Sequence, residues 1–138
     1  MKPNIVYHGS VTRNIVEFEP QKRYTPGVLG KNAKPLIYAA ADPAYAAGHG
    51  FEWSSDEGID IYEKGGVVIL EVPKKFKNRL NQSICVYELP SKTFHLLMKD
   101  SPKSLIYISS EKVKPISVNI FKSVFEGFKF YNSKIIIK

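Results

Sequence analysis

The stretch Leu36–Gly50 reads LIYAAADPAYAAGHG and carries the clearest run of structural signals in the chain. Its opening LIYAA is short and apolar, as expected of a buried strand. Asp42 is a favoured N-cap residue and Pro43 fits the first helical position, so a helix should begin here. The two glycines near the end of the stretch should loosen or end that helix. The pattern predicts a strand followed directly by a helix start, a junction where main-chain N–H groups can contact a ligand.

A second landmark, VYHGS at Val6–Ser10, lies near the start of the chain. Ile5–His8 predicts a short strand that Gly9 and Ser10 close. Gly9 lets a ligand approach the main chain closely, and the His8 imidazole can donate or accept a hydrogen bond. Taken singly, a histidine at a strand end is more often structural, and an aromatic residue in an apolar strand, such as Tyr38, is more often part of the core.

The remaining patterns indicate an α+β domain. Further strands are expected at Val16–Phe18, Val67–Val72, Ser83–Leu89, Leu105–Ile108 and Val113–Ile120, and in the alternating tail. Phe94–Met98 fits a strand or a helical turn, Phe51–Lys64 a ragged helix or an acidic loop, and Ile120–Phe128 a second helix. Glu19–Pro35 reads as a long ordered flap and Lys74–Gln82 as a basic connector. Six or seven short strands with two or three short helices, within 138 residues, predict one domain spanning 1–138.

The net charge of +7 is distributed unevenly. Residues 1–71 contain 7 Lys or Arg and 9 Asp or Glu, whereas residues 72–138 contain 13 and 4. A basic half can attract phosphate-bearing partners, which makes a nucleic-acid-binding domain one alternative. The lysines are scattered singly among apolar residues and only three arginines occur, a pattern equally typical of an ordinary solvated surface.

Several classes of function lack their motifs. The sequence contains no GxSxG, no P-loop and no GxGxxG after a strand. None of the three histidines has a metal-ligand spacing to another ligand residue, so no metal site is expected. The single cysteine, Cys85, stands in the apolar run SICVY and is expected to be a buried hydrophobe. No stretch is long and apolar enough for a membrane span and the first residues lack a secretion signal, which favours a cytoplasmic protein that does not bind membranes.

Together, HGS at His8–Ser10 and IYAA at Ile37–Ala40, followed by the helix start, resemble the ADP-ribosyltransferase-like fold. The resemblance is to its His-Tyr-Glu branch, which includes rifamycin ADP-ribosyltransferases, poly-ADP-ribose polymerases and RNA 2′-phosphotransferases. The segments VYELP at Val86–Pro90 and YISSEKVKPISV at Tyr107–Val118 are similar to later strands of small members. The resemblance implies two small packed antiparallel or mixed sheets, with a few short helices, around an NAD-type cleft.

The resemblance also implies NAD as the substrate and a role for each motif residue. His8 would hydrogen-bond the nicotinamide ribose, and the main chain of Gly9 would contact the nicotinamide amide. Ser10 would support the adenosine-side ribose, and Tyr38 would stack on the nicotinamide ring. Such positioning matters because cleavage of the N-glycosidic bond develops oxocarbenium character at the ribose.

Basic residues of the early loops complete the expected ligand contacts. Arg23 is the candidate for contacting the pyrophosphate, with Arg13 and Lys22 beside it in the sequence. A location on the solvated surface is the competing interpretation for all three.

The chain departs from the family pattern at the catalytic glutamate. Aligned on the later strand, Ile106 or Ser104 stands at that position, and neither side chain is an anion. Glu88 is the candidate carboxylate from another strand, and Glu111 is a second one. Two alternatives therefore stay open: an NAD-dependent transferase acting on an unknown protein or nucleic acid, or a catalytically inactive member that serves as a binding or interaction module.

Overall fold

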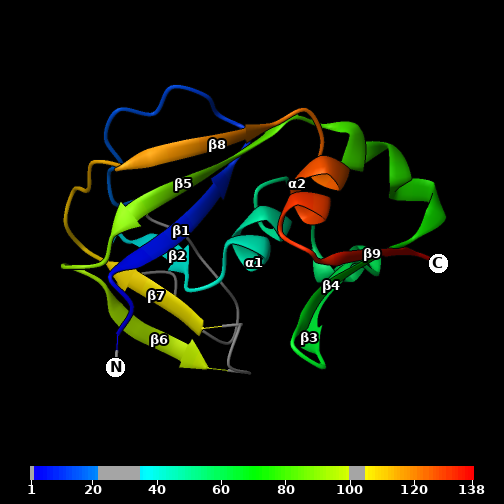
Figure 1. Cartoon of the computed structure of the whole chain (residues 1–138), viewed down its shortest axis with the longest axis horizontal. Helices are drawn as coiled ribbons and strands as arrows, with labels where there is room; N and C mark the ends of the chain where they lie inside the picture. The colour runs from blue at the N-terminus through cyan, green and yellow to red at the C-terminus, as the bar shows by residue number, and fades with distance from the viewer. Residues whose placement is uncertain (1, 22–34, 100–104) are drawn as a thin grey trace.

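The computed structural model describes residues 2–21, 35–99 and 105–138 (Figure 1). In chain order its strands are β1 (Ile5–Ser10), β2 (Ile37–Ala40), β3 (Asp60–Lys64), β4 (Val67–Val72), β5 (Ile84–Pro90), β6 (His95–Lys99), β7 (Leu105–Ser109), β8 (Ser117–Phe121) and β9 (Lys134–Ile137). The helices are α1 (Pro43–Gly48) and α2 (Val124–Phe130), with two 3-10 segments, η1 (Ser55–Glu57) and η2 (Lys74–Asn81). The predicted α+β class, with two small sheets and a few short helices, is confirmed.

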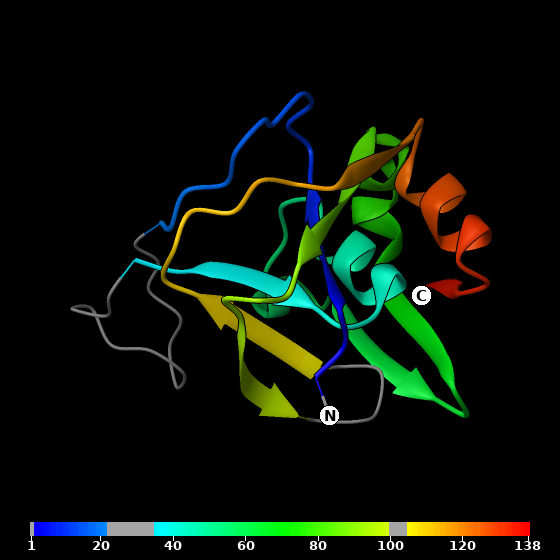
Figure 2. The ribbon, with the colours of Figure 1, turned by 60° about the vertical axis from the view of Figure 1, so that its left-hand side comes forward.

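The two sheets differ in size and direction. The larger has the order β6-β7-β2-β1-β5-β8 and is antiparallel throughout. The smaller has the order β3-β4-β9 and is mixed, because β9 runs parallel to β4. Figure 1 shows α1 between the two sheets and α2 beside it, and in the turned view of Figure 2 α1 again lies between β1 and the strands of the smaller sheet.

Helix α1 forms where the sequence predicts it. The Asp42 carboxylate accepts hydrogen bonds from the main-chain N–H groups of Ala44 at 2.9 Å and Tyr45 at 3.3 Å, as an N-cap should. Pro43 occupies the first turn, and the helix ends at Gly48. Every residue of α1 after Pro43 is buried. A helix made largely of Ala and Gly is thin enough to fit between two sheets, so its composition determines where it can lie.

Two apolar clusters hold the layers together. The first lies around α1, between the larger sheet on one side and β4 and α2 on the other, and includes Leu70, Leu80, Ile84 and Phe128, all nearly inaccessible to solvent. The second lies on the opposite face of the larger sheet. It includes Tyr87 of β5 and Phe94, together with Phe18 from the segment after β1 and Val113 from the segment after β7. The larger sheet is thus covered on both faces.

Three strand predictions need correction in their extent. Strand β1 continues through Gly9 and Ser10 instead of ending before them, because β5 pairs with it along its whole length. Val16–Phe18 forms only an isolated bridge between Phe18 and Val113, so the predicted strand there is wrong. Strand β8 begins after Pro115, which cannot donate a main-chain hydrogen bond, and lies at the edge of the sheet as predicted.

The acidic segment and the tail also differ from prediction. Phe51–Lys64 is neither a ragged helix nor a loop throughout, because it contains η1 and then β3, which pairs with β4. The basic connector after β4 is the 3-10 segment η2. The start of the tail, predicted as a strand from its alternation, completes α2, and only Lys134–Ile137 forms β9. Phe94–Met98 resolves as β6, a strand.

Two further expectations concern solvent and the membrane. Cys85 is buried in β5, as its apolar surroundings predict, and burial raises the pKa of its thiol. In the described ranges, no helix has the length and apolar character needed to cross a bilayer. Most of the predicted flap at Glu19–Pro35 lies outside the described residues.

Candidate functional site

Strands β1 and β2 lie side by side but separate almost at once. Strands β1 and β2 share one paired position, Tyr7 with Ala40, whereas β1 pairs with β5 at six positions. In the described part of the chain, no residue of β2 pairs with Gly9 or Ser10. We call the separation of β1 and β2 beyond Tyr7 the β1/β2 gap. It is located at the two sequence motifs that the family resemblance singled out.

The His8 side chain bridges the β1/β2 gap. Its Nδ1 lies 2.7 Å from the main-chain carbonyl oxygen of Tyr38, a distance at which a protonated Nδ1 donates a hydrogen bond. The ring also meets Phe18 edge-on, with 4.9 Å between ring centroids. With Nδ1 donating to a carbonyl, the neutral tautomer leaves Nε2 as an acceptor. His8 therefore joins two strands whose main chains have separated.

Gly9 is required by the helix behind it. A Cβ atom at Gly9 would lie 2.0 Å from the carbonyl oxygen of Ala46 and 2.9 Å from the Cα of Gly50. Both neighbours belong to the main chain, so no side chain can rotate away. The sequence suggested a glycine that lets a ligand approach, and the structure supplies an independent reason, namely direct contact of β1 with the end of α1. The same contact holds the HGS segment rigidly.

Tyr38 presents an unpaired phenol. Its hydroxyl is buried and has no hydrogen-bond partner among the described residues. Its neighbours Ile37 and Ala39 belong to the cluster on the outer face of the sheet, so strand alternation directs Tyr38 to the face that carries α1. Buried polar groups in proteins are nearly always hydrogen-bonded, and an exception calls for a specific explanation. An oxygen of this kind is suited to a polar group of a bound ligand.

The candidate carboxylate Glu88 lies on the other face of the sheet from the His8 ring. Glu88 is paired with Tyr7, whereas His8 is paired with Tyr87 on the face that carries Phe18. On the α1 side, burial raises the pKa of Tyr7, with the charges of Glu88 and Asp42 contributing further. Glu88 therefore lies near Tyr7 and Asp42 on the α1 side of the sheet, and the structure does not bring it to the His8 ring.

This set of polar side chains extends to the second helix. Burial also raises the pKa of Tyr131, which closes α2, against the opposing effect of a 3.3 Å hydrogen bond that its hydroxyl accepts from the Asn119 side chain. The charges of Glu88 and Asp42 act on Tyr131 in the same direction as burial. Both carboxylates thus lie near the phenols of Tyr7 and Tyr131.

The other candidates from the sequence are placed as follows. Ile106 is in β7, paired with Ala40 of β2 and packed against the core, so the position expected for a glutamate is apolar. Glu111 follows β7 and is exposed, with its main-chain N–H bonded to the Ser109 hydroxyl. Arg13 donates to the Ser83 hydroxyl at 3.0 Å. Arg23, Lys22 and Ser104 lie outside the described residues.

Two aromatic residues near the gap were not singled out from the sequence. His49 follows α1, and its ring stacks on Trp53 with 5.5 Å between centroids and meets Tyr45 at 4.9 Å. The Trp53 indole N–H donates to the carbonyl of Gly48 at 2.7 Å, which satisfies one of the free carbonyls at the end of α1. The spacing of four residues between Tyr45, His49 and Trp53 is the signal that would have revealed this stack.

We expect His49 to make stability depend on pH. Desolvation by neighbouring atoms lowers the pKa of the His49 ring to about 4, although the residue as a whole is exposed to solvent. Between the ordinary histidine pKa of about 6.5 and 4, the unfolded chain binds a proton that the folded chain excludes. Stability should fall as the pH decreases through this window. Chemical unfolding of the wild type and of His49→Gln at several pH values checks this. If the free energy of unfolding changes with pH equally in both proteins, the expectation is contradicted.

Within the described ranges, no three His, Cys, Asp or Glu side chains gather as a metal ion would require. Comparison with protein-family models, with curated proteins and with solved structures finds no match to this chain.

Proposed function

We propose that the chain has an ADP-ribosyltransferase-like fold and binds NAD, with the nicotinamide half of the dinucleotide in the β1/β2 gap. The observation that carries the proposal is the hydrogen bond across the gap from His8 Nδ1 to the carbonyl of Tyr38. It brings the two motifs of the family resemblance into contact although 30 residues separate them. Neither motif alone would support the assignment.

Three features support a ligand at this place. Gly9 and Ser10 have no β2 partner in the described residues, so this edge of β1 offers main-chain groups to a carboxamide. The buried Tyr38 hydroxyl has an unused hydrogen-bonding capacity. Contact between Gly9 and α1 holds the segment in place before a ligand arrives, which reduces the entropic cost of binding. The Tyr38 hydroxyl lies on the α1 face of the sheet and the His8 ring on the opposite face, so a ligand that uses both must pass between the two strands.

The chemistry that follows binding depends on a carboxylate. Transfer of ADP-ribose breaks the N-glycosidic bond, and an anion close to the ribose would stabilise the developing positive charge. Ile106 supplies none, and Glu88 lies on the opposite face from the His8 ring. These observations favour a domain that binds NAD without efficient transfer, acting as a binding module. Measurement of nicotinamide release from NAD distinguishes the two, since steady release that Glu88→Gln abolishes would establish cleavage of the N-glycosidic bond, with ADP-ribose passing to water or to a target.

Thermal unfolding in the presence of NAD tests the proposal. At ten times the dissociation constant, a ligand stabilises the folded state by about 1.4 kcal/mol, equivalent to about 5 °C in Tm for a chain of this size. AMP, which lacks the nicotinamide half, is the reference ligand. We expect NAD to raise Tm more than AMP does at the same concentration, and His8→Ala to abolish that excess.

The matched control is His95→Ala. His95 lies in β6 of the same sheet, with an exposed side chain distant in sequence from both motifs. This variant should keep the full excess shift. If NAD and AMP act equally on the wild type at millimolar concentration, nicotinamide binding in the β1/β2 gap is excluded.

A further inference from the structure

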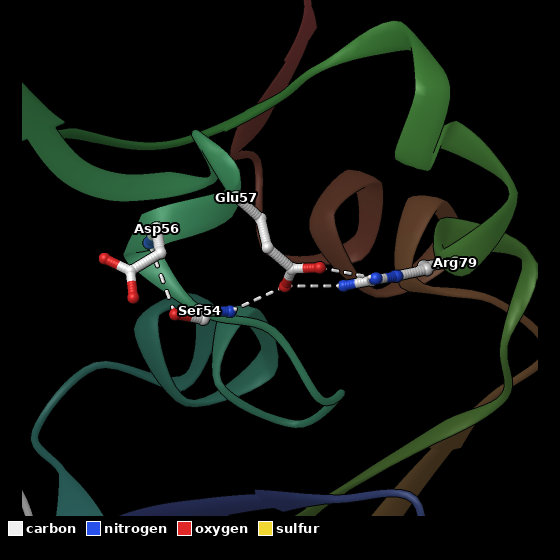
Figure 3. A network of polar contacts seen from close by, with 4 residues as sticks. All are labelled: Ser54, Asp56, Glu57 and Arg79. Carbon is white, nitrogen blue, oxygen red and sulfur yellow. Dashed lines mark hydrogen bonds and ion pairs between the residues drawn. The ribbon is translucent and has the colours of Figure 1, made fainter.

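A pocket of about 600 Å³ lies beside Trp53, bordered by η1 and η2. Its lining comprises Glu52, Trp53, Ser54, Glu57, Asn78, Arg79 and Gln82. The volume is within the range of sites that hold ligands the size of a nucleotide. Figure 3 shows the polar network on one side of it. None of its lining residues belongs to the β1/β2 gap.

The aromatic wall of the pocket is held in a fixed orientation. Trp53 donates its indole N–H to Gly48 and is stacked on His49, with an angle of 21° between the ring planes. A ring that is already fixed loses little conformational entropy when a second planar group stacks on it. Stacking on an aromatic side chain contributes about 1–3 kcal/mol for a nucleobase.

The charged pair in the pocket is structural. Arg79 donates Nη1–H to Oε1 of Glu57 at 2.8 Å and Nη2–H to Oε2 at 2.6 Å, and the Ser54 N–H donates to the same carboxylate at 3.0 Å (Figure 3). The Phe76 ring lies 4.3 Å from the guanidinium carbon. These contacts raise the pKa of Arg79 and lower that of Glu57. Because the two charges satisfy each other, this pair does not call for an anionic ligand.

The remaining polar groups of the pocket are available. Asn78, Gln82 and Glu52 are exposed to solvent where they line the pocket, and the Glu52 carboxylate also acts on the charge of Arg79. An amide offers a donor and an acceptor side by side, which matches the edge of adenine, and a carboxylate accepts from ring and exocyclic N–H groups such as those of guanine. Lys75 on η2 is exposed, and its charge acts on Glu57 of the pocket lining.

From this arrangement we propose that the pocket binds a purine nucleotide, with its base stacked on Trp53 and the edge of the base hydrogen-bonded by Asn78 and Gln82. Because Arg79 and Glu57 neutralise each other, a base without charge can lie beside them. The positive charge on η2 attracts the phosphate. The inference does not depend on NAD binding in the β1/β2 gap, because its residues come from other elements.

Fluorescence of Trp53 tests the proposal directly, since this is the only tryptophan in the sequence. Excitation at the red edge of tryptophan absorption avoids absorption by the nucleotides. AMP or GMP should quench the emission saturably, with a dissociation constant of about 1 mM or lower. Asn78→Ala and Gln82→Ala keep the reporter and should each raise that constant about fivefold, the effect of one lost hydrogen bond.

Asn81→Ala is the matched control, because Asn81 is an exposed residue of the same 3-10 segment that does not line the pocket. It should leave quenching unchanged. Far-ultraviolet circular dichroism of each variant excludes unfolding as the cause. The proposal is overturned if neither purine nucleotide quenches, if CMP binds as tightly, or if free arginine quenches more strongly than AMP. It is also overturned if Asn78→Ala and Gln82→Ala bind like the wild type.

Discussion

Gly9→Ala is expected to destabilise the chain by about 3 kcal/mol, equivalent to about 10 °C in Tm. The added methyl would lie 2.0 Å from the Ala46 carbonyl oxygen, far inside contact distance. Because the obstacle is main chain, relief requires α1 to move, and α1 is packed between the two sheets. Thermal unfolding of the purified variant measures the effect.

Gly65→Ala is the matched control for this substitution. Nothing lies within 4 Å of a Cβ at Gly65, but its φ of 59° is in the left-handed region. Its cost should therefore be about 1 kcal/mol and purely conformational. Equal effects of the two substitutions would mean that β1 does not touch α1 as described, and that the HGS segment is not held from behind.

Phe128→Ala is expected to cost about 3–5 kcal/mol. The Phe128 side chain is 1% exposed, and its ring lies 3.3 Å from the position that a Cβ on Gly48 would occupy. Its removal leaves a cavity where α2 meets α1, and the neighbouring strands cannot close it without losing their own pairing. Denaturant unfolding of the variant gives the change in free energy.

Phe130→Ala separates this cavity from a general effect of losing an aromatic ring in α2. Phe130 is 63% exposed, so its truncation removes little buried surface and should cost under about 1 kcal/mol. A similar loss for both variants would contradict the described orientation of α2, in which Phe128 faces the core and Phe130 faces solvent.

Local signals in the sequence were sufficient to predict helix α1. Asp42 and Pro43 determine where α1 begins by capping chemistry that needs no distant partner, and the structure places the helix there. Strand β4 was equally evident, because VVILEV is continuous and apolar. Both elements are defined by residues within their own span, which is why sequence reasoning found them.

Elements that depend on a distant partner were predicted less well. The sequence DIYEK of β3 is mostly polar, and it is a strand because β4 pairs with it from Asp60 to Lys64. Strand β9 pairs in parallel with β4, some 65 residues earlier, so the alternation of the tail gave a strand but not its correct start. Long-range pairing of this kind leaves only a weak local pattern in the sequence.

The candidate site was predictable in part. The motifs named His8, Gly9, Ser10 and Tyr38, and the His8 ring contacts the main chain of Tyr38 across the β1/β2 gap. The His8 ring and the Tyr38 side chain, however, lie on opposite faces of the larger sheet. The location of Glu88 on the opposite face could not be anticipated, because it depends on the register between β1 and β5. The pocket beside Trp53 was missed altogether, since it combines segments whose proximity arises only in the folded chain.

A titration of the isotope-labelled protein with NAD, followed by two-dimensional ¹H–¹⁵N NMR, tests the central proposal most directly. The amide signals of Gly9, Ser10 and Tyr38 should shift more than any others, and AMP at the same concentration should leave these three in place. If NAD shifts only the signals that AMP also shifts, or leaves these three amides unmoved at saturation, the nicotinamide half does not bind between β1 and β2.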